Sequence, residues 1–120
     1  MRTVIVVLAL LMTAVSAAAD DRRAIEAAAL DYAEGWYAGD ADRMARALHP
    51  DLAKRIVASK DGEPRLQHMT AEQLIAGTRK GYGKNVPPEK QLKDVKILDV
   101  FGNTATVRLE MAGWIDYLHV

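Results

Sequence analysis

The spacing of apolar residues predicts two helices between Asp20 and Pro50. Apolar and aromatic side chains recur every three or four residues along one stripe, and the charged side chains lie largely off it. Gly39 is expected to end the first helix. Asp40 can cap a short second helix, which Pro50 ends at His49. The inward-facing residues of these helices are Ile25, Ala28, Ala29, Tyr32, Trp36, Tyr37, Met44, Ala47 and Leu48.

A hairpin is predicted in the next stretch of the chain. Ile56 and Val57 suggest a first strand, and residues 65–69 suggest a return strand. Between them, Asp61-Gly62 is the expected tip of a tight turn, because these residue types tolerate the backbone geometry that such turns require.

A third helix is expected over residues 70–83. Thr70 and Gln73 form a capping box, in which each side chain satisfies a free backbone N–H of the first turn. Two glycines end the helix, and residues 84–91 form a loop because their two prolines disfavour both helix and central strand. The buried residues of this helix are expected to be Leu74 and Ile75.

The last third of the chain predicts three strands. Two strands within residues 92–111 are joined by a tight turn at Gly102-Asn103. A bend or bulge at residues 112–113 precedes a last strand over residues 114–120. Helices therefore come early and strands late, which favours an α+β domain with helices on one face of an antiparallel sheet.

The first 19 residues have the pattern of a secretory signal peptide. Arg2 provides the positive start, residues 4–12 are apolar, and alanines at 17–19 suit a cleavage site. The apolar run is short for a transmembrane helix, although an uncleaved anchor is the alternative. Cleavage after Ala19 would leave residues 20–120 as one exported domain, periplasmic or secreted, with no membrane attachment.

Composition removes several classes of function. The chain has 16 basic and 16 acidic residues, so a zero net charge gives no general attraction to nucleic acid. It has no cysteine, which excludes disulfides, thiol catalysis and thiolate metal sites. The three histidines share no metal-ligand spacing, and no Gly-rich phosphate loop is present. We therefore expect neither a metal nor a cofactor.

Asp116 is the first candidate for chemistry. Alternation along the last strand places it on one face with Trp114, Leu118 and Val120. A carboxylate on an apolar face that lines a pocket could act as a general base or a proton donor. The alternative is a structural role, in which Asp116 accepts hydrogen bonds from backbone or tyrosine groups or faces water.

His49 is the second candidate for catalysis. It lies at the end of the second predicted helix, where a cation is favoured and the ring can cap free carbonyl groups. The functional alternative is a proton shuttle that faces Asp116.

Three aromatic residues and two basic residues complete the candidates. The aromatic stripe of Tyr32, Trp36 and Tyr37 is most simply core, but a tyrosine hydroxyl could donate to a ligand carbonyl. Lys54 and Arg55 are expected to be solvated, although Arg55 could hold an anionic group of a ligand.

Several segments together resemble the putative lumazine-binding family of exported proteins. They are "YAEGWYAGDADRMARALHPDLAKR", "MTAEQLIAGTR", "VKILDVFGNTATVRLE" and "WIDYLHV". This family is similar in fold to the nuclear-transport-factor-two-like superfamily. The resemblance implies a curved antiparallel sheet wrapped around the N-terminal helices, in a cone-shaped, cystatin-like roll with an apolar pocket. It also implies a further strand after Val120, so that the chain is expected to be C-terminally truncated.

The resemblance leaves three functions open, because members of the superfamily include isomerases, dehydratases, polyketide cyclases and binding or dimerising modules. The favoured one is a domain that binds a small apolar ligand. The others are an acid–base enzyme that uses Asp116, and a non-catalytic homodimerisation module. The expected ligand-binding residues are Tyr32, Trp36, Tyr37, Arg55, Trp114, Asp116 and Leu118.

Overall fold

The computed structural model describes the backbone of residues 2–120 and the side chains of residues 17–120. Most of the predicted signal peptide therefore lies outside the described side chains. The elements in chain order are α1 Arg2–Ala38, α2 Ala41–Ala47, β1 Ala53–Lys60, β2 Glu63–Thr70, α3 Ala71–Arg79, the 3₁₀ turns Tyr82–Asn85 and Pro88–Lys90, β3 Lys93–Phe101, β4 Thr104–Met111 and β5 Trp114–His119.

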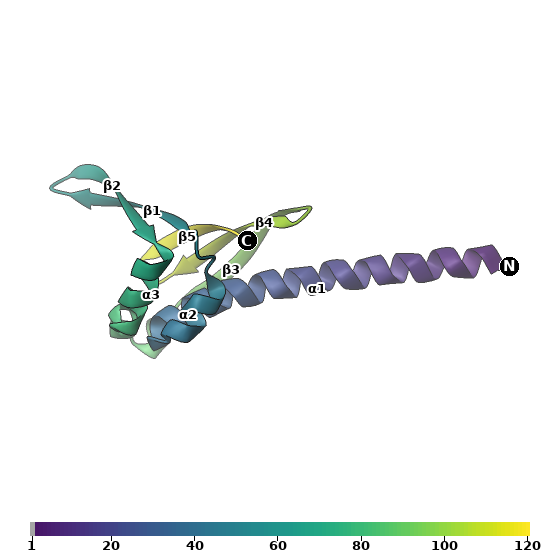
Figure 1. Ribbon diagram of the computed structural model, residues 1–120, viewed down its shortest axis with the longest axis horizontal. Coiled ribbons are helices and arrows are strands. Elements are labelled where there is room, and N and C mark those ends of the chain that lie inside the picture. Colours follow the sequence, from purple (N-terminus) through teal and green to yellow (C-terminus); the bar gives the residue numbers. More distant parts are fainter. Residues whose placement is uncertain (1) are drawn as a thin grey trace.

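Helix α1 is continuous from Arg2 and passes through the predicted cleavage point after Ala19. Its N-terminal half projects away from the rest of the chain (Figure 1). The signal peptide and the separate domain at residues 20–120 stay predictions. Among the described residues, no helix has the combined length and apolar character that membrane crossing requires.

Local capping sets the ends of the helices largely as predicted. Gly39 adopts a positive φ of 68° and ends α1, and the Asp40 side chain accepts the N–H of Arg43 at 2.9 Å. At α3, Thr70 and Gln73 form the predicted capping box, with both reciprocal hydrogen bonds present. Each cap satisfies an N–H that the first turn of a helix leaves free.

Strands β1 and β2 form the predicted hairpin, which projects from the body (Figure 1). Asp61 and Gly62 both have positive φ, 55° and 82°, as a two-residue turn of the mirror-image class requires. The register places Val57 opposite Leu66 and Lys54 opposite Met69.

Strands β3, β4 and β5 form a second antiparallel sheet. Residues 112–113 are the turn of a hairpin between β4 and β5, because Met111 pairs with Trp114. The prediction of a bend or bulge at residues 112–113 is therefore wrong. The register of the sheet shifts instead in β3, between Ile97 and Asp99. The inner side chains of β4 are buried.

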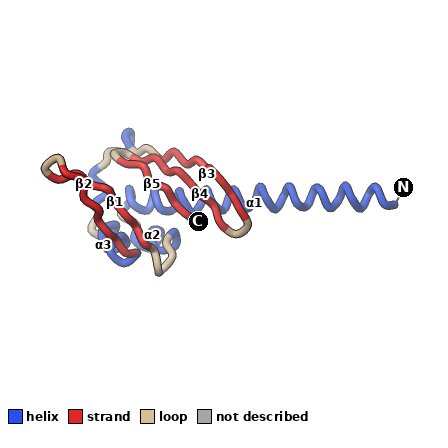
Figure 2. The backbone as a smooth tube through the Cα atoms, turned by 90° about the horizontal axis from the view of Figure 1, so that it is seen from above, coloured by secondary structure: helices blue, strands red, loops and turns tan. Residues whose placement is uncertain are grey.

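The core lies between this sheet and the C-terminal half of α1, which crosses the three strands (Figure 2). The predicted α+β class, with antiparallel strands curved around N-terminal helices, is confirmed. The five strands belong to two sheets, β1–β2 and β3–β4–β5, which share no ladder. The core cluster is Tyr32, Ala33, Tyr37, Met44, Leu74, Leu109 and Met111.

Candidate functional site

Three polar side chains meet between α1 and the two sheets, and we call Tyr32, Lys54 and Asp116 the polar cluster. The Lys54 ammonium donates to Asp116 Oδ1 at 2.9 Å and to Oδ2 at 3.0 Å. It also donates to the Tyr32 hydroxyl at 2.6 Å. The Tyr32 hydroxyl in turn donates to Asp116 Oδ2 at 2.9 Å. The cluster is thus a closed triangle of charge-assisted hydrogen bonds.

Each member comes from a different element, and alternation or helical spacing explains its direction. Tyr32 lies on the buried stripe of α1. Lys54 shares the inner face of β1 with Ile56, and both are half-buried. Asp116 pairs with the buried Leu109 of β4, so its side chain points inward.

The environment keeps the Tyr32 phenol neutral. Burial raises its pKa far above the ordinary range for tyrosine, and the negative charge of Asp116 raises it further. Tyr32 is therefore a hydrogen-bond donor to the carboxylate at every physiological pH. The Lys54 and Asp116 side chains retain only 16% and 18% of their exposure, so water screens their attraction weakly.

Two tryptophans border the polar cluster. The rings of Trp36 on α1 and Trp114 on β5 have centroids 5.8 Å apart at an angle of 54°. The Lys54 ammonium lies 6.0 Å from the Trp114 ring centroid and 5.2 Å from that of Tyr32, within cation–π range. Trp114 is 45% exposed, so part of its indole remains available for contact.

Tyr37 and Leu118 are occupied by contacts within the protein core. The Tyr37 hydroxyl donates to the carbonyl of Leu92 at 2.8 Å and accepts the N–H of Ala112 at 2.8 Å. It therefore ties α1 to one end of the three-stranded sheet, where β3 begins and β4 turns into β5. Leu118 is half-buried and packs against the core cluster.

His49 and Arg55 lie apart from the polar cluster. His49 is exposed, and its Nδ1 accepts the N–H of Asp51 at 3.1 Å, a local bond just beyond α2. Neither residue is among the hydrogen-bond partners of Asp116, which are Lys54 and Tyr32. Arg55 is exposed on the opposite face of β1 from Lys54.

Lys54 is the functional candidate that sequence reasoning missed. We expected it to be solvated, and that expectation is wrong because its ammonium is bound by Asp116, which is 62 residues away. The alternation around Ile56 could have placed Lys54 on the inner face, but nothing local indicates its partner. The sequence pattern therefore supplies the direction of this side chain and not its contact.

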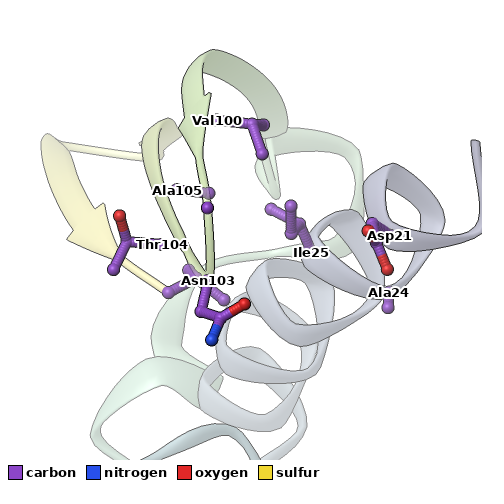
Figure 3. A pocket seen from close by; sticks show the side chains of 9 residues that line it. Asp21, Ala24, Ile25, Val100, Asn103, Thr104 and Ala105 are labelled. Atoms are coloured by element: carbon purple, nitrogen blue, oxygen red, sulfur yellow. The ribbon is translucent and has the colours of Figure 1, made fainter. Parts of the chain in front are cut away.

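We describe two open hollows within residues 17–120, and neither of these two is lined by Asp116. One, of about 370 Å³, lies between α1 and the β3–β4 turn, where Ile25 faces Val100 and Ala105 (Figure 3). The other, of about 420 Å³, lies outside the β1–β2 hairpin and includes Arg55 and His68. A ligand at the polar cluster would thus rest against the open face of Trp114.

The chemistry available at the polar cluster is hydrogen bonding and aromatic stacking. It offers ammonium donors, carboxylate acceptors and indole faces within a few ångströms of one another. Within residues 17–120, no group of three or more histidine or acidic side chains could hold a metal ion.

Comparisons with known proteins assign the family. No curated protein and no solved structure matches the chain significantly. The family model described as "Putative lumazine-binding" matches residues 20–120, which are all the residues after the predicted cleavage point. The chain therefore belongs to this family, within the nuclear-transport-factor-two-like superfamily, as its sequence resemblance predicted.

Proposed function

We propose that the protein is an exported domain that binds a small planar ligand at the polar cluster, against Trp114. The observation that carries the proposal is the Lys54–Asp116 pair, which is held mostly out of water beside a half-exposed indole. Ligand sites typically combine apolar and aromatic walls with a few placed polar groups.

The chemistry favours a flat heterocycle that carries both N–H and C=O groups. Its ring would stack on Trp114, and its N–H would donate to a remaining lone pair of Asp116. Its carbonyl would replace the Tyr32 hydroxyl as an acceptor for Lys54. Lumazine, after which the family is described, is a ligand of this kind. It is therefore the first compound to test, together with other bicyclic and tricyclic heterocycles.

Calorimetric titration of the full chain with lumazine tests the proposal. We expect saturable binding that weakens at least about tenfold in Lys54→Met and in Asp116→Asn, since each change removes one charge-assisted hydrogen bond. Arg65→Gln is the control, because Arg65 is exposed on β2 and distant in register from Lys54. Affinity that is unchanged in both cluster variants would place the ligand elsewhere and overturn the proposal.

Export is supported by the pattern of the first 19 residues and by the family match, which begins at Asp20. Expression of the full chain in a bacterial host, followed by fractionation and intact-mass measurement, tests it. We expect a periplasmic product that begins at Asp20. A cytoplasmic or membrane-retained product of full mass would contradict export.

Acid–base catalysis by Asp116 is less well supported than binding. His49, the expected proton shuttle, is exposed and bonds locally to Asp51, so it does not face the Asp116 carboxylate. The Asp116→Asn variant also tests this alternative, because an enzyme would lose turnover while the ligand still bound.

A further inference from the structure

The outer face of the β1–β2 hairpin carries a second group of side chains, separate from the polar cluster. Because side chains alternate along a strand, Arg55 points away from the face that holds Lys54. In the antiparallel register Arg55 lies directly opposite His68, and the next pair on the same face is Val57 opposite Leu66. A cationic row thus adjoins an apolar row.

This face borders the hollow of about 420 Å³ that lies between the hairpin and the start of α3. Arg55, His68, Thr70 and Gln73 provide its polar lining, and Leu52 provides apolar lining. Within residues 17–120, no salt bridge involves Arg55 or His68. The Arg55 guanidinium has one hydrogen bond, to the carbonyl of Lys54 at 3.3 Å.

We propose that this hollow binds a small organic anion with a carboxylate head and a short apolar body. The planar guanidinium of Arg55 suits a carboxylate, because its parallel N–H groups match the two oxygens. His68 supplies a ring N–H from the facing strand. No acidic side chain shares these outer rows of the hairpin, so the charge of the face is complementary to an anion.

The apolar row explains why the anion should carry a hydrocarbon body. Val57 is 76% exposed and Leu66 is 57% exposed, and together they form a cross-strand apolar pair next to the cationic row. A ligand whose head lies on Arg55 can cover this pair and remove its surface from water. The site is independent of the polar cluster, since the two lie on opposite faces of β1.

Amide chemical shifts of the ¹⁵N-labelled full chain test the inference, with hexanoate as the probe. We expect saturable shifts at Ala53, Arg55, His68 and Gln73, and an affinity at least about fivefold weaker for acetate and for hexanol. Arg55→Gln should reduce the affinity for hexanoate about tenfold, and His68→Gln should reduce it less. Arg65→Gln is the matched control, because Arg65 pairs with Ala58 on the other face of the same hairpin.

Three results would overturn the inference. They are an absence of shifts at these amides, equal affinity for hexanol and hexanoate, and an unchanged affinity in Arg55→Gln. Arg55 is exposed, so its replacement should leave the remaining amide spectrum, and therefore the fold, intact. A negative result with hexanoate would not bear on lumazine binding at the polar cluster. That proposal is tested separately, by calorimetric titration of the Lys54 and Asp116 variants.

Discussion

Lys54 on β1 and Asp116 on β5 are joined by an ion pair with an Nζ–Oδ1 distance of 2.9 Å, although their sheets share no backbone ladder. Both residues also bond Tyr32 on α1. The polar cluster therefore ties together three parts of the chain that apolar packing alone connects loosely. This makes the pair both the centre of the proposed ligand site and a link in the fold.

Replacing one member of this pair should destabilise the protein. Lys54→Met leaves the Asp116 carboxylate largely buried without its cation. We expect a loss of about 2 kcal/mol in the free energy of unfolding, somewhat below the cost for a fully buried pair. Urea denaturation followed by circular dichroism measures the change.

The double variant Lys54→Met/Asp116→Leu provides the control, because it removes both charges and fills the same space with apolar side chains. We expect it to recover most of the lost stability, with a coupling energy of about 1–2 kcal/mol in the double-mutant cycle. Additive losses in the two single variants would show that the pair does not act as a unit.

Tyr32→Phe should change the response of the protein to alkaline pH. The folded-state pKa of Tyr32 is raised, first by burial and then by Asp116. A raised pKa contributes stability that is fully present below the unfolded pKa of about 10 and is lost as pH rises above it. The wild type should therefore lose stability above about pH 10 more steeply than Tyr32→Phe. Unfolding curves between pH 8 and 11 test this, and parallel slopes would contradict it.

The sequence predicted the elements well because their signals are local. Asp61-Gly62, Gly102-Asn103 and the Thr70–Gln73 capping box each depend on residues within a few positions, and all three form as expected. The contacts of the polar cluster could not be predicted in this way. Tyr32 and Asp116 are 84 residues apart, and only the packing of α1 against two sheets brings them together. Periodicity placed Tyr32 on the inward stripe of its helix and Asp116 on one face of its strand, but it did not indicate that the two residues are partners.

Tyr37→Phe should loosen the turn between β4 and β5. The hydroxyl accepts the Ala112 N–H and donates to the Leu92 carbonyl, both at 2.8 Å. Its removal leaves two half-buried backbone groups without a partner, at a cost of about 1–3 kcal/mol. Hydrogen exchange of the Ala112 amide should become at least about tenfold faster, since the bond that protects it is lost. An unchanged rate would show that another contact protects this amide.

Glu34→Gln should reduce stability at neutral pH and have less effect in acid. The hydrogen bond from Lys93, together with the charge of Arg43, lowers the pKa of Glu34. A lowered pKa contributes stability that is present above the unfolded value of about 4.5 and is lost as pH falls through the folded value. We expect a difference from wild type of about 0.5–1 kcal/mol at pH 7, the range for a partly exposed pair. The difference should shrink below pH 4, and a constant difference across pH would contradict this.

Gly83→Ala should disturb the tryptophan pair that borders the proposed ligand site. Gly83 is buried, and a Cβ atom there would collide with the Trp36 carbonyl oxygen and lie only 2.6 Å from the Trp36 indole nitrogen. The indole cannot yield without moving against Trp114, so we expect a loss of about 1–3 kcal/mol and altered tryptophan fluorescence. Gly77→Ala is the control, because its Cβ would meet the exposed Tyr82 ring at 3.3 Å and the Trp36 ring only at 3.8 Å, an ordinary van der Waals distance. Alanine is also the better helix former. Wild-type stability and fluorescence in both variants would contradict this prediction. They would show that the contact of Gly83 with Trp36 does not position the two indoles.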